Sequence, residues 1–432
     1  MKSLLYFIKK FDIIFVFSIY ILLILISCFF YPNISCDEIW NFQNIYKMYN
    51  GFIIYKDCNI IITPIFFVIG NLLFKIFNAN LLTFKFYNLL IFASFPTSLY
   101  SLFITLDFNK RKAFLFSATI FSTFASGIKT GANYNILAIV FVIIGMNFFL
   151  LSRKKFIYLI FNSFIIYATI FTKQNIGAYY VIGICLAEFL LNKNFVTTIK
   201  RLLIQAIPAI ILSCISLFIM YKYNILYDFI NYAILGINEF SFSNFSLDIW
   251  SILLLLAISS LYAFIFWIMK KNFITNQVVK ENLKLLICIS FPLNLVIYPI
   301  LNLYHFLLAL IFVMILFFYI LDYLVFTPIL GKTLYNKLSV IISIIIITLD
   351  LLYSLLSIFN VIEVPIYCKD KNHPYYNCYF SIEMTSKINT ITKYITEENS
   401  KNIDVIVFSN EAALYMIPLR TKSWILWFTF RW

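Results

Sequence analysis

Long apolar stretches, separated by short polar segments, follow one another from the N-terminus almost to residue 360. A hydrocarbon core about 30 Å thick needs about 20 helical residues to cross it, and backbone polar groups cannot stay unpaired in lipid. The pattern therefore predicts an all-α polytopic membrane protein. We expect about eleven spanning helices, at residues 11–31, 86–106, 113–127, 134–151, 156–171, 177–191, 202–221, 249–269, 285–301, 306–327 and 338–361.

Basic residues gather in alternate loops between these predicted spans. The clearest clusters lie at residues 110–112, 153–155 and 270–271, and Lys9 and Lys10 precede the first span. Because short basic loops of membrane proteins face the cytoplasm, we expect a multi-pass protein of the cytoplasmic (inner) membrane. Its N-terminus is then cytoplasmic and its C-terminus extracytoplasmic.

Two shorter helices are expected in the first outer loop, residues 32–85. Residues 39–50 place apolar side chains at helical spacing, and Gly51 is expected to end that helix. Thr63 followed by Pro64 predicts an N-cap with proline at the first helical position of a second helix that runs to residue 77. A crossing there would invert the charge bias of every later loop, so both helices are expected to lie along the outer surface.

Composition excludes a water-soluble fold. The chain is 62% hydrophobic and 12% charged, whereas soluble proteins average about 45–50% apolar and about 25% charged residues. No small-residue cleavage site follows the first apolar stretch, which is therefore an anchor and not a signal peptide. The net charge of +14 is assigned to inner loops beside anionic membrane lipids. The sequence carries no nucleic-acid-binding patch, so no nucleic acid partner is expected.

The composition becomes more polar after residue 360, and residues 362–432 are expected to form a small extracytoplasmic α/β segment. A helix is predicted over 381–399, a buried strand over 404–409 and another helix from 410. The apolar end, 423–432, either enters the interface or reflects a truncated reading frame. Two disulfides are conceivable in an oxidising compartment, Cys36 with Cys58 and Cys368 with Cys378.

A family resemblance rests on motifs at the predicted outer ends of the spans. The segment YPNISCDE, ending at Glu38, precedes two short helices and six further spans. This order resembles the conserved module of the GT-C glycosyltransferases over residues 1–222, with 223–361 as variable C-terminal helices. It is similar, more narrowly, to the family of protein O-mannosyltransferases and lipid A aminoarabinose transferases. TKQN at 172–175 and YHFLL at 304–308 add support.

The resemblance implies inverting transfer of a sugar from a polyprenyl phosphate donor to a lipid, glycan or protein acceptor. Such a step needs a carboxylate to take the acceptor proton and cations to neutralise the leaving phosphate. Asp37 is the candidate base, and its neighbour Glu38 would orient the acceptor or a metal ion. The candidate substrate-binding residues are Lys173, Gln174, Tyr304 and His305.

Each candidate also has an ordinary structural explanation. Asp37 and Glu38 would stabilise the start of the following helix through its dipole. Lys173 would anchor a helix end at the interface, and Tyr304 with His305 would form an amphipathic pair at headgroup level.

Metal dependence stays open at this point. Relatives often carry a second acidic residue in the next outer loop, but residues 127–135 (GIKTGANYN) contain none. Either no metal is used, or Asn133, Asn135 or Glu38 supplies oxygen ligands to a divalent ion. No other cofactor is expected.

Two other functions fit a polytopic chain. A lipid-linked sugar flippase or transporter should line its path with intramembrane charges, whereas Glu188, Asp322 and Asp350 lie near span ends. An O-antigen-type polysaccharide polymerase or ligase should carry its large outer loop late in the chain. The long first outer loop with Asp37 favours the glycosyltransferase.

Overall fold

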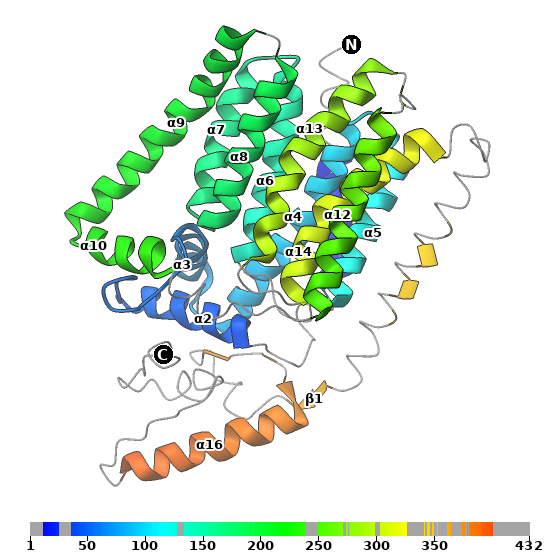
Figure 1. Ribbon diagram of the computed structural model, residues 1–432. Helices are drawn as coiled ribbons and strands as arrows, with labels where there is room; N and C mark the ends of the chain where they lie inside the picture. The colour runs from blue at the N-terminus through cyan, green and yellow to red at the C-terminus, as the bar shows by residue number, and fades with distance from the viewer. Residues whose placement is uncertain are drawn as a thin grey trace.

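The computed structural model describes residues 12–25, 36–127, 134–192, 194–237, 249–270, 274, 276–298 and 303–325, and parts of 341–400. Helices dominate these residues and gather into one bundle (Figure 1). The bundle consists of Asp12–Leu25, α4 (Leu81–Thr105), α5 (Lys110–Gly127), α6 (Tyr134–Ser152), α7 (Ile157–Ile170), α8 (Gln174–Leu191), α9 (Phe195–Lys222), α12 (Ile249–Lys270), α13 (Gln277–Leu293) and α14 (Leu303–Ile320).

The helices carry the signature of a membrane-embedded protein. Five stretches in the described part of the chain are long and apolar enough to cross a membrane: α4, α6, α8, α9 and Tyr304–Tyr323. Shorter apolar helices accompany them, at Asp12–Leu25, α3 (Ile65–Phe77), α7 and Leu255–Trp267. Large apolar side chains are exposed along them, as at Ile207, Ile210 and Ile211 of α9, and such a surface requires lipid around it. The count of eleven crossings stays a prediction.

One predicted span is displaced. Residues 285–301 were expected to form it, but α13 begins at Gln277, where the Asn276 side chain accepts hydrogen bonds from the amides of Val278 and Val279. Such a cap stabilises the start of a helix, because it satisfies backbone N–H groups that have no partner within the helix. The helix then gives way to a 3-10 turn, η2 (Asn294–Ile297), directly after Pro292. The first turns of α13 carry charged side chains, so the hydropathy of the sequence did not indicate that the helix begins there.

The two short helices of the first loop are present, and Figure 1 shows α2 lying across one end of the bundle. They are α2 (Cys36–Tyr49) and α3. Gly51 ends α2 as predicted, with a φ of 93° that glycine adopts without strain. The predicted cap of α3 is wrong, because Pro64 takes the N-cap position and the Thr63 hydroxyl donates to the carbonyl of Ile170, 2.9 Å away.

The start of α3 is instead joined to the end of α7. The amide of Ile65 donates to the carbonyl of Phe171 at 2.8 Å, alongside the bond from Thr63. Carbonyls at a helix C-terminus need such partners because the helix itself supplies none. The turn between α7 and α8 is therefore held directly against the first loop.

A segment after α9 was not anticipated. It comprises α10 (Leu226–Phe229) and a π-helical turn, η1 (Ile230–Leu235). Figure 1 shows α9 leaning away from the other helices toward α10. The ring of Phe229 lies 5.1 Å from that of Tyr55 and 6.5 Å from that of Phe171. The segment thus returns to the loop before α3 and to the α7–α8 turn.

The described part of the tail is anchored to the same end of the bundle. Strand β1 (Val361–Glu363) pairs antiparallel with β2 (Phe380–Ser381), and α16 (Ile382–Ser400) confirms the predicted amphipathic helix. The amide of Leu81 donates to the Pro374 carbonyl at 2.7 Å. The predicted strand 404–409, the helix from 410, the end 423–432 and most of 338–361 lie outside the described residues. Neither anticipated disulfide is formed, because Cys58 and Cys378 are buried thiols outside any disulfide bond.

A buried polar network joins three helices, α6, α8 and α9. Glu188 of α8 is 2% exposed and accepts from the Arg201 Nε at 3.0 and 2.8 Å. The amide of Gln205 donates to the same carboxylate at 3.1 Å, and Asn192 donates at 2.6 Å. The Arg201 guanidinium also reaches the Ser152 hydroxyl of α6 at 2.9 Å. A buried charge pair needs partners of this number to offset its desolvation.

Two glycines mark close helix contacts and give a stability prediction. A Cβ on Gly183 would lie 2.7 Å from the Ile289 Cα, so α8 and α13 approach backbone to backbone, whereas a Cβ on Gly70 would meet the end of the Ile45 side chain at 2.3 Å. Small residues permit such contacts between membrane helices. Gly183→Ala is expected to cost about 1–3 kcal/mol of stability by overpacking. Gly70→Ala should cost less, because Ile45 can rotate away.

The measurement is thermal unfolding of each variant in the same detergent, followed by size exclusion. Equal losses in the two variants, or no loss for Gly183→Ala, would show that α8 and α13 are not in backbone contact.

Candidate functional site

Asp37 lies in the first turn of α2, at the end of the bundle where the two short helices meet it. The N-terminal end of a helix favours an acidic residue through its dipole, and both Asp37 and Glu38 occupy this first turn. The Asp37 side chain is open to the surface on one side. The surrounding protein still removes enough water to raise the pKa of its carboxyl, while the charge of Lys173 lowers that pKa. The carboxylate and the ammonium therefore face one another within electrostatic range.

Lys173 is held in the turn between α7 and α8, at the N-cap position of α8. Its side chain is half-buried, and the Nζ lies 4.8 Å from the centroid of the Tyr134 ring. A cation over an aromatic face is stabilised by the ring quadrupole. Burial lowers the pKa of the Lys173 ammonium to about 8, and the Asp37 carboxylate opposes that shift. The Lys173 ammonium therefore begins to lose its proton at a pH only slightly above neutral.

His305 and Tyr304 approach the same point from the first turn of α14. Their rings are 5.2 Å apart and nearly perpendicular, and Lys173 acts electrostatically on His305. The side-chain amide of Asn135 donates to the Tyr304 hydroxyl at 3.4 Å. Four of the predicted site residues, Asp37, Lys173, Tyr304 and His305, are therefore brought together from three distant segments of the chain.

Tyr134 is the member of this cluster that sequence reasoning missed. It is the first residue of α6, and its ring contacts those of Trp40 and Phe66 at 6.4 and 6.2 Å. Its hydroxyl is in electrostatic range of Asp37 and of Tyr304. Tyr134 stands between Asn133 and Asn135 in the loop considered for metal ligands, so an aromatic residue at that span end was the available signal. We call Asp37, Lys173, Tyr134, Tyr304 and His305 the Asp–Lys cluster.

Glu38, the neighbour of Asp37, is in contact with α4. It is buried, and its carboxylate accepts a hydrogen bond of 3.3 Å from the Asn88 amide of α4. It also acts electrostatically on Cys378 of the tail. Neighbouring residues on a helix are about 100° apart, which separates the two acidic side chains. Glu38 contacts α4 and the tail, and its predicted role toward an acceptor or metal stays a prediction.

Gln174 follows Lys173 directly, yet its side chain is bound to backbone. Its Nε2 donates to the carbonyl of Ile61 and to the carbonyl of Ala233, each at 2.8 Å. Both amide hydrogens are therefore used inside the protein. The contact with substrate predicted for Gln174 stays a prediction.

Two of the three oxygen ligands considered for a divalent ion lie in the described part of the chain. Asn135 is engaged with Tyr304 and Glu38 with Asn88, while Asn133 lies outside the described residues. Within those residues, no three His, Cys, Asp or Glu side chains gather at one point. The predicted alternatives for metal dependence therefore stay predictions.

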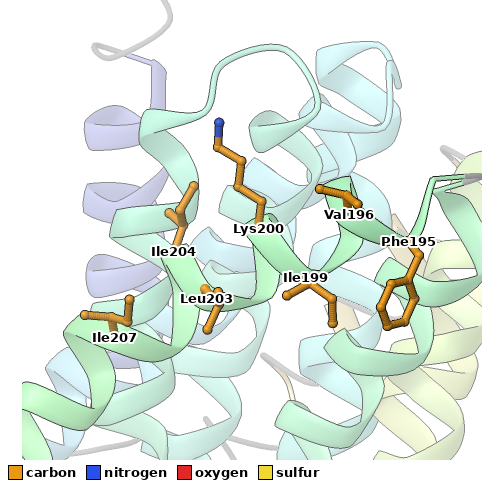
Figure 2. A pocket seen from close by; sticks show the side chains of 7 residues that line it. All are labelled: Phe195, Val196, Ile199, Lys200, Leu203, Ile204 and Ile207. Atoms are coloured by element: carbon orange, nitrogen blue, oxygen red, sulfur yellow. The ribbon is translucent and has the colours of Figure 1, made fainter.

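A groove of about 410 Å³ runs along the outer side of α9 and is lined by apolar side chains with one lysine (Figure 2). The lining residues are Phe195, Val196, Ile199, Lys200, Leu203, Ile204 and Ile207. All belong to a single helix whose spanning segment is largely unburied. The groove contains no acidic side chain and suits contact with lipid better than it suits chemistry.

Similarity to known proteins adds nothing to this description. The chain matches no protein-family model, no curated protein and no solved structure. What it does must therefore be argued from the Asp–Lys cluster and its position in a membrane protein.

Proposed function

We propose that the chain is an inverting membrane glycosyltransferase of the GT-C type. It moves a sugar from a polyprenyl phosphate donor to a hydroxyl of a lipid, glycan or protein acceptor. The observation that carries the proposal is the placement of one carboxylate, Asp37, within electrostatic range of one cation, Lys173, at an end of a membrane-embedded helical bundle. The proposal includes eleven crossings, a cytoplasmic N-terminus and an active end that faces outward.

Asp37 acts as the general base. The acceptor oxygen attacks the anomeric carbon as the carboxylate takes the hydroxyl proton, and positioned bases of this kind contribute about 10²–10⁴-fold to a rate. The bond between the anomeric carbon and the phosphate oxygen breaks, and its electron pair leaves with the phosphate. Attack from the side opposite the leaving group inverts the anomeric configuration.

Lys173 receives the charge that develops on the leaving phosphate. A preorganised cation in a partly dry site stabilises such charge far better than water does. The Tyr134 ring holds the ammonium at 4.8 Å, and Tyr304 and His305 stand beside it as hydrogen-bonding groups. The polyprenyl phosphate then leaves with its charge balanced.

The lipid nature of the donor is supported by the surface beside the cluster. Helix α3 buries Phe66 and Phe67 toward Trp40 and Tyr134. Its other side exposes Val68, Leu72 and Ile76, which recur every four residues and so form one apolar stripe. A polyprenyl chain in the bilayer can lie against this stripe while its phosphate reaches Lys173.

Transport is less well supported. The charged pair buried between α8 and α9 is Glu188 with Arg201, and its hydrogen-bonding capacity is taken up by neighbours. The charges of a transport site should lie near the middle of the membrane, whereas Glu188 lies in the last turn of α8. Among the described residues, the buried pair therefore reads as structural.

The pH dependence of transfer is the first test of the proposal. We expect a bell-shaped profile of kcat/KM, which reports the free enzyme. The acid limb reflects Asp37, whose carboxyl pKa is raised by burial, because only the carboxylate accepts a proton. The basic limb lies near pH 8, because the Lys173 ammonium loses its charge as the pH rises through its pKa of about 8.

Lys173→Arg is the diagnostic variant, since a guanidinium stays protonated throughout the accessible range. It should remove the basic limb near pH 8 while leaving the acid limb in place. If the basic limb of the kcat/KM profile is the same in Lys173→Arg as in the wild type, Lys173 is not the group that titrates in the reaction.

A further inference from the structure

Gln174 occupies a position from which three separate segments can be held together. It is the first residue of α8 and directly follows the cation of the Asp–Lys cluster. Its side-chain nitrogen has two hydrogens, and each is donated to a carbonyl at 2.8 Å, one on Ile61 and one on Ala233. The reverse orientation of the amide would set its oxygen against two carbonyl oxygens, so these bonds fix its direction.

The two carbonyls belong to segments that are far apart in the sequence. Ile61 lies in the loop before α3, where the Tyr55 hydroxyl donates to the carbonyl of Ile62 at 2.7 Å. Ala233 lies in the π-helical turn η1 and is fully buried. π-helical turns leave irregular backbone groups and often occur at functional sites. Gln174 satisfies one such carbonyl.

Aromatic packing surrounds this junction. Tyr55 is fully buried, and its ring meets Phe229 edge-on at 5.1 Å. Phe229 stacks on Phe171 of the α7–α8 turn at 6.5 Å. The loop before α3, the α7–α8 turn and the η1 segment therefore form one packed layer, and the amide of Gln174 links all three.

We propose that Gln174 is a positioning residue, whose two hydrogen bonds hold the first turn of α8 so that Lys173 stays against Tyr134 and faces Asp37. The η1 segment becomes part of the wall around the site through the same link. The consequence for sugar transfer rests on the proposed function, but the position of Lys173 can be measured without any substrate.

The test is competitive amine labelling of Lys173 in the full-length protein, with quantification by mass spectrometry across pH 6–11. In the wild type Lys173 should titrate near its pKa of about 8. The titratable groups of the cluster around Lys173 are the same in the variants compared below. They are Asp37, Tyr134, Tyr304 and His305.

Gln174→Met keeps the length of the side chain but removes both donors. It should release Lys173 to solvent and move its titration upward, toward the ordinary lysine range. The matched control is Gln277→Met, at the first residue of α13, which should leave the titration of Lys173 in place. Should Gln174→Met fail to fold, Gln174→Asn retains the amide at a shorter reach and is read in the same way.

Transfer activity gives a second readout. Displacement of Lys173 should reduce kcat/KM about tenfold or more, because a small misplacement of a positioned group can cost up to about 10²-fold, and it should shift the basic limb of the pH profile with the labelling titration. An unchanged labelling curve in folded Gln174→Met would overturn the positioning role. Absence of transfer in the wild type would instead count against the proposed function, while the labelling experiment would still decide the role of Gln174.

Discussion

Asp37→Asn is expected to lower the rate of sugar transfer by about 10²–10⁴-fold, the usual contribution of a positioned general base. The amide has almost the shape of the carboxylate but cannot take the acceptor proton. The loss should fall on kcat, because the proton moves only in the transition state. Folding should be preserved, since the side chain is open on one side and α2 is held by its buried residues Phe42 and Ile45.

The matched control is Asp107→Asn, the same change at an exposed residue between α4 and α5, which should leave transfer within about twofold of wild type, as surface changes away from a site usually do. Activity is measured with a radiolabelled polyprenyl phosphate sugar in membranes, after size exclusion has shown equal folding. Comparable activity in Asp37→Asn and wild type would mean that another group takes the proton.

Glu188→Met is expected to destabilise the protein by about 3–5 kcal/mol, the cost of leaving one member of a buried ion pair alone. Arg201 is nearly buried and would keep Ser152 as a partner but lose the carboxylate that balances its charge. Gln205 and Asn192 would lose an acceptor at the same time. The effect should be structural, because this network is separate from the Asp–Lys cluster.

Removing both charges of the Glu188–Arg201 pair should lower the stability of the protein much less than removing one of them. Buried pairs replaced by apolar residues of similar volume are often neutral in stability, so Glu188→Met combined with Arg201→Met should recover most of the loss. The measurement is the temperature at which half of the detergent-solubilised protein stays monodisperse. A double variant less stable than Glu188→Met would contradict this account, because it would show that Arg201 stabilises the bundle without its partner.

The Asp–Lys cluster was accessible from sequence because of where its members lie along the chain. Asp37, Lys173, Tyr304 and His305 all stand at span ends that the distribution of basic loops assigns to one side of the membrane. Helices that cross a bilayer bring such ends into one layer, whatever their order in sequence.

Other features depend on partners that a sequence pattern cannot supply. The contact of Tyr134 with Lys173 is a tertiary contact, so the position of this tyrosine at a span end could not by itself assign it to the cation. Gln174 was considered for substrate binding, but two backbone carbonyls far away in sequence take its donors. Thr63 was expected to cap α3 by accepting a backbone hydrogen bond. Its hydroxyl instead donates to the carbonyl of Ile170 at the end of α7.

The most direct test of the central claim is a transfer reaction with purified wild-type protein in proteoliposomes. A polyprenyl phosphate sugar labelled in the sugar is supplied with a panel of lipid, glycan and peptide acceptors, and polyprenyl phosphate release and the product's anomeric configuration are measured. The account predicts equal amounts of free polyprenyl phosphate and of glycosylated acceptor, with inverted configuration. Donor left intact with every acceptor, in protein shown to be folded, would contradict it.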